Sequence, residues 1–323
     1  MANFSCAPVV LLGYRRPDHT SQVFQAIRAA RPAQLFLVMD GPKISVPGDS
    51  AAVVKTREIL ENIDWPTNVR RLYASSNLGL KVRVTSGLDV VFEEVKDAII
   101  VEDDCLPSPD FFHFATEMLE RYGEDPRVGM VSGSSRLRGK PVSPYSYDFS
   151  RDVRIWGWAT WARTWKEFSS SGDLDATWDL PQQQSLAKQF PSGARQRSMA
   201  KMLAHASDLD SWALPFVVHC VNRGYVNPVP VENLVTNIGL GPSSTHTQFE
   251  SWVAEVPWGQ LSFPLAHPPE VLPNDLLDTT ESAEDARFFI SYPIRHPFDA
   301  ARRIMSYLAL MLRRKFSQRG SLD

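Results

Sequence analysis

Short apolar runs alternate with stretches of helical periodicity over the first 135 residues of the chain. Such runs are typical of strands buried on both faces, and the stretches between them have the spacing of helices with one buried face. The expected strands lie at 8–13, 35–39, 69–73, 98–101 and 128–132. The expected helices lie at 20–30, 51–63, 80–95 and 110–122. This alternation predicts an α/β fold with a doubly wound, mostly parallel sheet covered on both faces.

The alternation ends after residue 139, where the character of the chain changes. From 140 to 273 the chain contains tryptophan-rich stretches, short helical stretches and many prolines, which predicts a subdomain packed on the first part. The acidic, proline-containing segment 272–285 is expected to be a linker. We therefore expect an α/β half at 1–139, a second half of the same unit at 140–273, and a linker with a C-terminal helix at 274–323.

Composition sets limits on partners and compartment. The 323 residues carry a net charge of −3, so no broad basic excess exists to neutralise phosphates, and we expect no nucleic acid partner. Three distant cysteines (Cys6, Cys105 and Cys220) form neither a disulfide framework nor a metal-binding spacing. The sequence has no basic leader and no apolar run of about 18 residues. These features predict a cytoplasmic protein.

Three consecutive carboxylates, Glu102, Asp103 and Asp104, directly follow the expected strand at 98–101. Carboxylates held together repel one another, and a divalent cation relieves that repulsion. Oxygen ligands without nearby Cys or His favour Mg²⁺ or Mn²⁺ over Zn²⁺. The alternative is an acidic strand-to-helix turn, whose charges stabilise the N-terminus of the next helix. Charged residues also follow the first two strands, at the rim where such sheets bind ligands, which favours a ligand site.

The order of these segments resembles a known family. A strand followed by Glu-Asp-Asp and then by Pro-Asp-Phe-Phe at 109–112 is similar to the metal-binding segment of GT-A fold glycosyltransferases. The match is closest to the N-acetylglucosaminyltransferase I type, with bacterial glycosyltransferases of similar layout also resembling it. Matching segments run in order over about two thirds of the chain: Gly13-Tyr14-Arg15, Val38-Met39-Asp40, Trp156-Gly157-Trp158, Asp210-Ser211-Trp212 and 239–246.

The resemblance implies roles for the residues that follow the strands. Asp104 is the expected ligand of a Mn²⁺ or Mg²⁺ ion, and Asp103 and Glu102 are expected to contact the ribose and nearby groups. Asp40 is expected to read a uracil ring, and Arg15 to contact the nucleotide.

Three further donor-side residues follow from the same resemblance. Arg16 is a second candidate for the nucleotide contact. Lys81 falls in a donor-side segment and is expected to meet a phosphate, with a solvated lysine at a helix start as the alternative. His246 lies in a Gly/Ser/His loop of the kind that orders over a bound donor, with a surface histidine as the alternative.

On the acceptor side, the resemblance places a Gly-Trp segment beside the donor sugar. Trp158 and Trp156 are the expected aromatic contacts, with core packing as the alternative. The family has an acid directly before a Trp as the base that deprotonates the acceptor. Here Ser211 holds that position, so the expected base is Asp210, one residue further back, with Asp208 as the fallback and a helix-start carboxylate as the alternative.

The C-terminal segment 298–316 combines an apolar helical face with five basic residues. A basic amphipathic helix of this kind binds a membrane interface, and a helix docked on the protein is the alternative. We expect peripheral contact with the inner face of the membrane, which suits a lipid-linked acceptor.

Together these features predict a metal-dependent glycosyltransferase. It is expected to move a sugar from a nucleotide sugar, a UDP-sugar by the resemblance, to a hydroxyl of a glycan or lipid-linked acceptor with inversion. One alternative is a nucleotidyltransferase that makes sugar nucleotides, although residues 11–15 hold a single glycine where a glycine-rich phosphate loop is usual. The other is a non-catalytic carbohydrate-binding protein.

Overall fold

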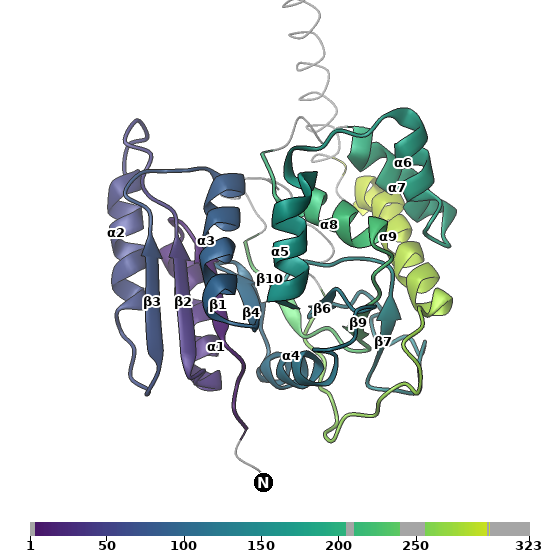
Figure 1. Ribbon diagram of the computed structural model, residues 1–323, viewed down its shortest axis with the longest axis horizontal. Helices are drawn as coiled ribbons and strands as arrows, with labels where there is room; N and C mark the ends of the chain where they lie inside the picture. Colours follow the sequence, from purple (N-terminus) through teal and green to yellow (C-terminus); the bar gives the residue numbers. More distant parts are fainter. Residues whose placement is uncertain (1–3, 205–209, 240–255, 296, 298–323) are drawn as a thin grey trace, which may run out of the picture.

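A six-stranded sheet forms the centre of the computed structural model, which describes residues 4–204, 210–239, 256–295 and 297 (Figure 1). Its strand order is β3-β2-β1-β4-β8-β6. The strands are β1 (Val9–Gly13), β2 (Gln34–Met39), β3 (Asn68–Tyr73), β4 (Asp97–Glu102), β6 (Met130–Ser132) and β8 (Trp158–Trp161). β1 to β4 pair in parallel, while β8 is antiparallel to both of its neighbours. The predicted α/β fold with a mostly parallel sheet is confirmed.

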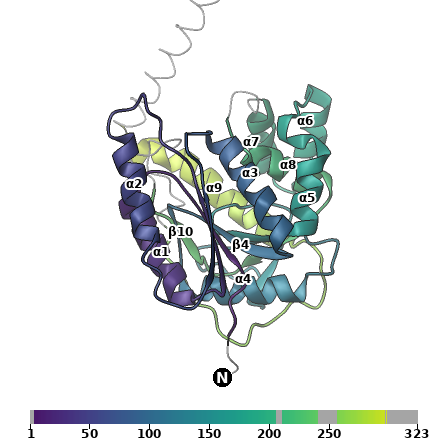
Figure 2. The same cartoon turned by 60° about the vertical axis from the view of Figure 1, so that its left-hand side comes forward.

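Helices cover both faces of this sheet (Figure 2). They are α1 (Pro17–Ala30), α2 (Asp49–Leu60), α3 (Leu80–Glu94), α4 (Pro109–Arg121), α5 (Ala162–Ser171) and α8 (Ala213–Asn222). Alternate residues of a strand point to opposite faces. Val9 and Leu11 accordingly belong to one core with residues of α1, α2 and α4, while Val10 and Leu12 belong to a second core with residues of α3, α5 and α8. The sheet is therefore doubly wound.

Every strand and helix expected before residue 135 is present, with small shifts at the ends. Pro109 begins α4, where its missing N–H costs nothing. The hydroxyl of Ser108, however, makes no capping hydrogen bond to α4.

The second half of the chain completes the sheet and adds a helical layer. Two short ribbons pair β5 (Cys105–Pro107) with β10 (Val235–Asn237), and β7 (Tyr147–Ser150) with β9 (Asn227–Pro230). The 3-10 turn η1 (Asp173–Asp175) and the helices α6 (Leu180–Ala187) and α7 (Gly193–Ala204) follow α5. Because β8 lies between β4 and β6, both halves of the chain build the central sheet.

The acidic segment expected to be a linker is instead part of α9 (Asp275–Arg295). Its carboxylates pair with basic residues that precede β8, including Glu281 with the buried Arg154 and Asp278 with Arg151. The expectation failed because these partners lie more than 120 positions away in the sequence. The basic segment 298–316 lies outside the described residues.

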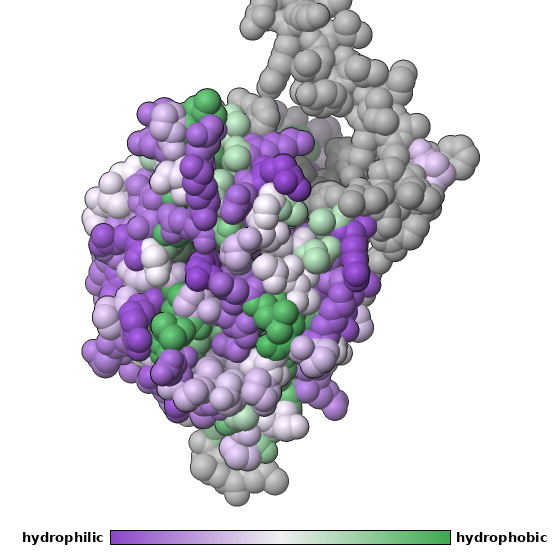
Figure 3. Space-filling view, turned by 90° about the vertical axis from the view of Figure 1, so that its right-hand side faces the viewer, coloured by the Kyte–Doolittle hydropathy of each residue, from purple (hydrophilic) through white to green (hydrophobic). Residues whose placement is uncertain are grey.

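The state of the cysteines, the hydropathy of the helices and the polarity of the surface complete the description. Cys6, Cys105 and Cys220 are buried free thiols. Across the residues with assigned structure, no helix has the length and apolar character needed to cross a bilayer. The face shown in Figure 3 is mostly hydrophilic, with a few separate apolar patches.

Candidate functional site

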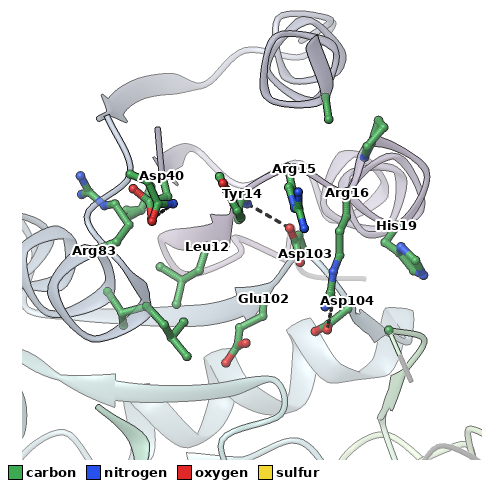
Figure 4. Close-up of a pocket in the computed structure, with 18 of the residues that line it drawn as sticks. Leu12, Tyr14, Arg15, Arg16, His19, Asp40, Arg83, Glu102, Asp103 and Asp104 are labelled. Atoms are coloured by element: carbon green, nitrogen blue, oxygen red, sulfur yellow. Dashed lines mark hydrogen bonds and ion pairs between the residues drawn. The ribbon is translucent and has the colours of Figure 1, made fainter. Parts of the chain in front are cut away.

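A cleft of about 790 Å³ opens at the carboxyl ends of β1, β2 and β4. This is the edge at which open α/β sheets bind ligands, because loops diverge there. Its walls come from the loops after these strands, the start of α3, and the residues that follow β10. Figure 4 shows the charged side chains that converge on it. Eight of the candidate residues line the cleft: Arg15, Arg16, Asp40, Glu102, Asp103, Asp104, Trp156 and Asp210.

The acidic turn after β4 is held by the loop after β1. Asp103 is buried, and its Oδ2 accepts a hydrogen bond of 3.0 Å from the backbone N–H of Tyr14. Asp104 forms an ion pair with Arg16, with 2.5 Å between Oδ2 and Nη1. The two carboxylates are therefore fixed by different parts of one loop, and Glu102 lies beside them at the end of β4 (Figure 4).

Burial and mutual repulsion perturb this turn. Burial and the charges of Asp104 and Asp103 raise the pKa of Glu102 to about 8, although Arg16 opposes the rise. Burial and Asp104 likewise raise the pKa of Asp103 to about 7. The turn thus holds more negative charge than the nearby guanidinium balances. A divalent cation would favour the ionised form of each carboxylate.

The donor set of the turn fits Mg²⁺ or Mn²⁺. All three side chains offer oxygen, and the backbone of Gly239 comes close to Asp104 in a way that only glycine allows, since a Cβ built there would lie 2.2 Å from Oδ2 of Asp104. Within the described ranges, no three His, Cys, Asp or Glu side chains converge as a ready-made metal cage. The turn therefore suits an ion that takes one or two protein carboxylates and completes its shell with phosphate oxygens and water.

Arg15 stands at the cleft rim, tethered to a buried carboxylate. Its Nη1 lies 2.5 Å from Oδ1 of Asp49. Asp49 also accepts hydrogen bonds from the Tyr14 hydroxyl at 2.5 Å and from the backbone N–H of Lys43 at 2.7 Å. The position of Arg15 is thus set by the start of α2, while its side chain remains 39% exposed.

Asp40 accepts four hydrogen bonds within the protein. Oδ1 accepts from the backbone N–H of Gly41 and of Leu78, at 2.8 and 2.9 Å. Oδ2 accepts from the side-chain amide of Asn77 and the backbone N–H of Gly79, at 2.8 and 3.2 Å. Both oxygens are engaged in fixing the loop before α3, a role that the sequence does not reveal. A contact between this carboxylate and a uracil ring would have to replace some of these bonds.

Two expected residues point away from the cleft. Lys81 pairs with Asp175 of η1, with 2.5 Å between Nζ and Oδ1, and does not line the cleft. Trp158 is fully buried, with its ring 5.4 Å from that of Trp212 in the core. Position 158 lies inside β8, where the register with β4 and β6 turns the side chain under α8. Trp156, just before the strand, lines the cleft.

Asp210 lines the cleft beside Gly79, the N-cap residue of α3. It is exposed, and its Oδ2 lies 3.0 Å from the position of a Cβ built on Gly79. Trp212, two residues later, is buried in the core before α8. The one-residue offset from the family pattern therefore still leaves a carboxylate in the wall. Asp208 and His246 lie outside the described residues.

Arg83 and Asn237, the last residue of β10, were not found from the sequence. Arg83 lies one turn into α3 and lines the cleft near Asp40 (Figure 4). Burial lowers the pKa of Arg83, although the charge of Asp40 opposes this. Its spacing of four from Gly79 is the signal that could have placed it on the same face as the cleft. Asn237 and Gly239 line the wall beside Asp104.

Sequence comparisons with known proteins give no relative: no family model matches the chain, and no curated protein matches it. Among solved structures, the chain is similar to a cytidylyltransferase from Leptospira borgpetersenii, with a TM-score of 0.32 and 10% identity over 52% of this chain and 65% of that one. It is also similar to a 4-diphosphocytidyl-2C-methyl-D-erythritolsynthase from Anaerococcus prevotii, with a TM-score of 0.33 and 9% identity over 63% and 84%.

A third similar structure is the UTP-bound UGPase from Acinetobacter baumannii. Its TM-score is 0.28, with 11% identity over 67% of this chain and 93% of that one. This chain spans 65% of the length of the first of the three proteins. Likenesses of this extent assign neither a reaction nor a substrate to this chain.

Proposed function

We propose that the cleft binds a nucleotide sugar with a divalent cation and transfers the sugar to an acceptor hydroxyl. The observation that carries this proposal is the meeting of three groups at one sheet edge. They are the acidic turn ending in Asp104, the arginines Arg15, Arg16 and Arg83, and the carboxylate of Asp210. A cation with arginines suits a diphosphate, and a further carboxylate suits a hydroxyl that must lose its proton.

The chain's own residues would divide the work of binding. Arginines present planar donors that match phosphate oxygens, so Arg15, Arg16 and Arg83 are the proposed diphosphate contacts. Asp104, with Asp103 or Glu102, would hold Mn²⁺ or Mg²⁺. When bound, the ion supplies a Lewis acid that stabilises charge on the departing nucleoside diphosphate.

The proposed reaction is a single displacement at the anomeric carbon. The acceptor oxygen forms its bond to that carbon as the bond to the diphosphate oxygen breaks, and Asp210 takes the acceptor proton. Such a displacement inverts the configuration. Trp156 offers an aromatic surface to the sugar in the same cleft. A UDP-sugar as donor, and a glycan or lipid-linked sugar as acceptor, are the proposed substrates.

Nucleotidyl transfer is the second candidate. The same carboxylates and arginines suit a nucleoside triphosphate, and one of the similar structures is described as a cytidylyltransferase. The loop after β1 favours the first reading, because the N–H of Tyr14 is bonded to Asp103 and a Cβ on Gly13 would lie 2.9 Å from the Met39 Cε. That loop is packed against its neighbours and does not form an open cradle of N–H groups.

A ligand panel tests the proposal directly. The thermal midpoint is measured with UDP, GDP, CDP and dTDP, each with and without Mn²⁺. A ligand at one hundred times its dissociation constant stabilises the folded state by about 2.7 kcal/mol. We expect a Mn²⁺-dependent shift with UDP. The absence of a shift with every nucleotide would contradict the proposal and favour a carbohydrate-binding protein.

Products separate the two reactions. With a nucleotide sugar and an acceptor, glycosyl transfer releases nucleoside diphosphate. With a nucleoside triphosphate and a sugar phosphate, nucleotidyl transfer releases pyrophosphate. Release of pyrophosphate with no transfer from nucleotide sugars would establish the second candidate.

A further inference from the structure

We propose that Arg16 is a place-holder cation. Its guanidinium pairs with the carboxylate of Asp104 in the ligand-free protein, and it moves to the diphosphate when a divalent ion binds Asp104. This inference rests on the proposed function, since it concerns the same cleft. It assigns Arg16 as a positioning residue that couples ion binding to nucleotide binding.

The ion pair bridges two loops at the cleft floor. Arg16 is the N-cap residue of α1, and its side chain extends from there to the turn after β4 (Figure 4). Its Nη1 lies 2.5 Å from Oδ2 of Asp104. The two side chains are 19% and 16% exposed, so the pair is partly shielded from water. Shielding strengthens the attraction and makes the guanidinium an effective counterion.

Backbone closes over the other side of this pair. The N–H of Ile238 donates to the backbone carbonyl of Asp104 at 2.8 Å. At the next residue, Gly239, a Cβ would lie 2.2 Å from Oδ2 of Asp104 and 2.7 Å from Nη1 of Arg16. Oδ2 of Asp104 is thus flanked by the backbone at Gly239 and by the guanidinium of Arg16. A cation that ligates Oδ2 must displace the Arg16 side chain.

The neighbouring arginine shows a different arrangement. Arg15 pairs with Asp49, which lies at the start of α2 and also holds Tyr14 and Lys43. Asp49 is not part of the acidic turn, so Arg15 does not compete directly with an ion bound at Asp104. Two adjacent arginines in one loop therefore have distinct partners, and Arg15 provides a matched control for Arg16.

Opposite effects on two ligands follow from this geometry. In the absence of nucleotide, Arg16 competes with the ion for Oδ2 and repels it, so Arg16 weakens ion binding. Once the ion is bound, the displaced guanidinium is released beside the diphosphate position and strengthens anion binding. Ion and nucleotide consequently promote each other's binding, as linked equilibria require.

Isothermal titration of the full chain tests the proposal with Mn²⁺ alone, and with inorganic pyrophosphate at saturating Mn²⁺. Pyrophosphate is used because it needs no knowledge of the base. For Arg16→Gln we expect about tenfold tighter Mn²⁺ binding and about tenfold weaker pyrophosphate binding, since one charge interaction is lost in each case. Arg15→Gln also loses a proposed diphosphate contact, so we expect weaker pyrophosphate binding, but unchanged Mn²⁺ affinity because Arg15 pairs with Asp49 and not with Asp104. Arg16→Lys should restore both affinities toward those of the native protein.

The outcomes separate this inference from the proposed function. If the native protein binds Mn²⁺ and pyrophosphate but Arg16→Gln binds Mn²⁺ equally or more weakly, the place-holder role is wrong and the proposed function stands. If the native protein binds neither, both are overturned. The thermal midpoint of each variant is recorded, and Arg16→Met, which also removes the positive charge, carries the comparison should Arg16→Gln fail to fold.

Discussion

At the scale of single residues, the three carboxylates after β4 have different surroundings although they are adjacent in sequence. Asp104 is paired with Arg16, Asp103 accepts a backbone hydrogen bond, and Glu102 carries the pKa raised to about 8. Because strand and turn geometry point successive side chains in different directions, three adjacent carboxylates have an ion pair, a backbone hydrogen bond and a raised pKa respectively.

Replacing Glu102 by Gln should stabilise the ion-free protein at alkaline pH. The folded pKa of about 8 lies above the ordinary value of 4.5, so folding disfavours the ionised form. That cost is absent below about pH 4.5, grows as the pH rises and is complete above pH 8. We expect Glu102→Gln to raise the free energy of unfolding by on the order of 2 kcal/mol at pH 8.5, and by little at pH 4.5.

Urea unfolding in the presence of EDTA at the two pH values measures this difference. Glu120→Gln, at an exposed position of α4, is the control and should change stability at neither pH. An equal effect of Glu102→Gln at both pH values would show that the gain does not come from ionisation.

Asp104→Ala and Asp210→Asn should fail in different ways. Asp104→Ala removes the proposed ion ligand, so we expect loss of transfer and of the Mn²⁺-dependent part of nucleotide binding, with folding intact. Asp210→Asn removes the proposed base, so we expect a loss of about 10²–10⁴ in turnover with nucleotide binding retained. Single-turnover assays and titration calorimetry measure the two. Near-normal turnover of Asp104→Ala with excess Mn²⁺ would rule out its assignment.

At the scale of elements, the loop before α3 depends on the end of β2. Asp40 fixes this loop through three hydrogen bonds, from Asn77, Leu78 and Gly79. The loop carries the turn that starts α3 and presents Arg83 to the cleft. Gly79 allows the junction, since its φ of +83° lies in a region that L-residues rarely adopt. Asp40 therefore acts on the cleft through an element that it does not belong to.

Asp40→Ala should destabilise the protein by about 2–3 kcal/mol, because buried N–H groups lose a charged acceptor. Nucleotide affinity should fall as well, since Arg83 loses its fixed position. Equilibrium unfolding and calorimetry measure the two effects. Asp175→Ala is the control: this residue pairs with Lys81 but its side chain is 84% exposed, so its loss should change stability by under about 1 kcal/mol. Equal effects of the two substitutions would contradict the role given to Asp40.

At the scale of the whole molecule, α9 packs against the segment before β8 through ion pairs. Glu281 contacts the buried Arg154, and its Oε1 accepts the backbone N–H of Arg136 at 2.8 Å. Burial lowers the pKa of Arg154 to about 10, although the charge of Asp152 opposes this. Asp278 accepts from the Ser150 hydroxyl at 2.5 Å. Docking of α9 is therefore strongly polar, and the buried Arg154 relies on the ion pair with Glu281.

Glu281→Gln should destabilise the protein by about 3 kcal/mol, because Arg154 is left in the interior with less compensation. Chemical unfolding followed by circular dichroism measures the change. Glu284→Gln, on the same helix, loses a pair with Lys140 that is more exposed, and should cost under about 1 kcal/mol. A loss of similar size in both variants would argue against a special role for the buried pair.

The sequence by itself determined the elements and the location of the cleft. Continuous apolar strands and helical periodicity are local patterns, so β1 to β4, β6, the first four helices and the carboxylates at 102–104 could be assigned without tertiary contacts. Parallel strands bring their carboxyl ends to one edge, and this rule placed Arg15, Asp40 and Asp104 in one wall.

Only the tertiary structure decided which groups are paired and which face the cleft. β8 enters the sheet between β4 and β6, although its residues lie far from both in sequence, and this register buries Trp158. Lys81 turns to Asp175, and α9 forms where its carboxylates meet distant arginines. The physical reason is common to these cases. Ion pairs and sheet register join residues across long sequence separations, and local sequence patterns do not indicate which of the distant residues will pair.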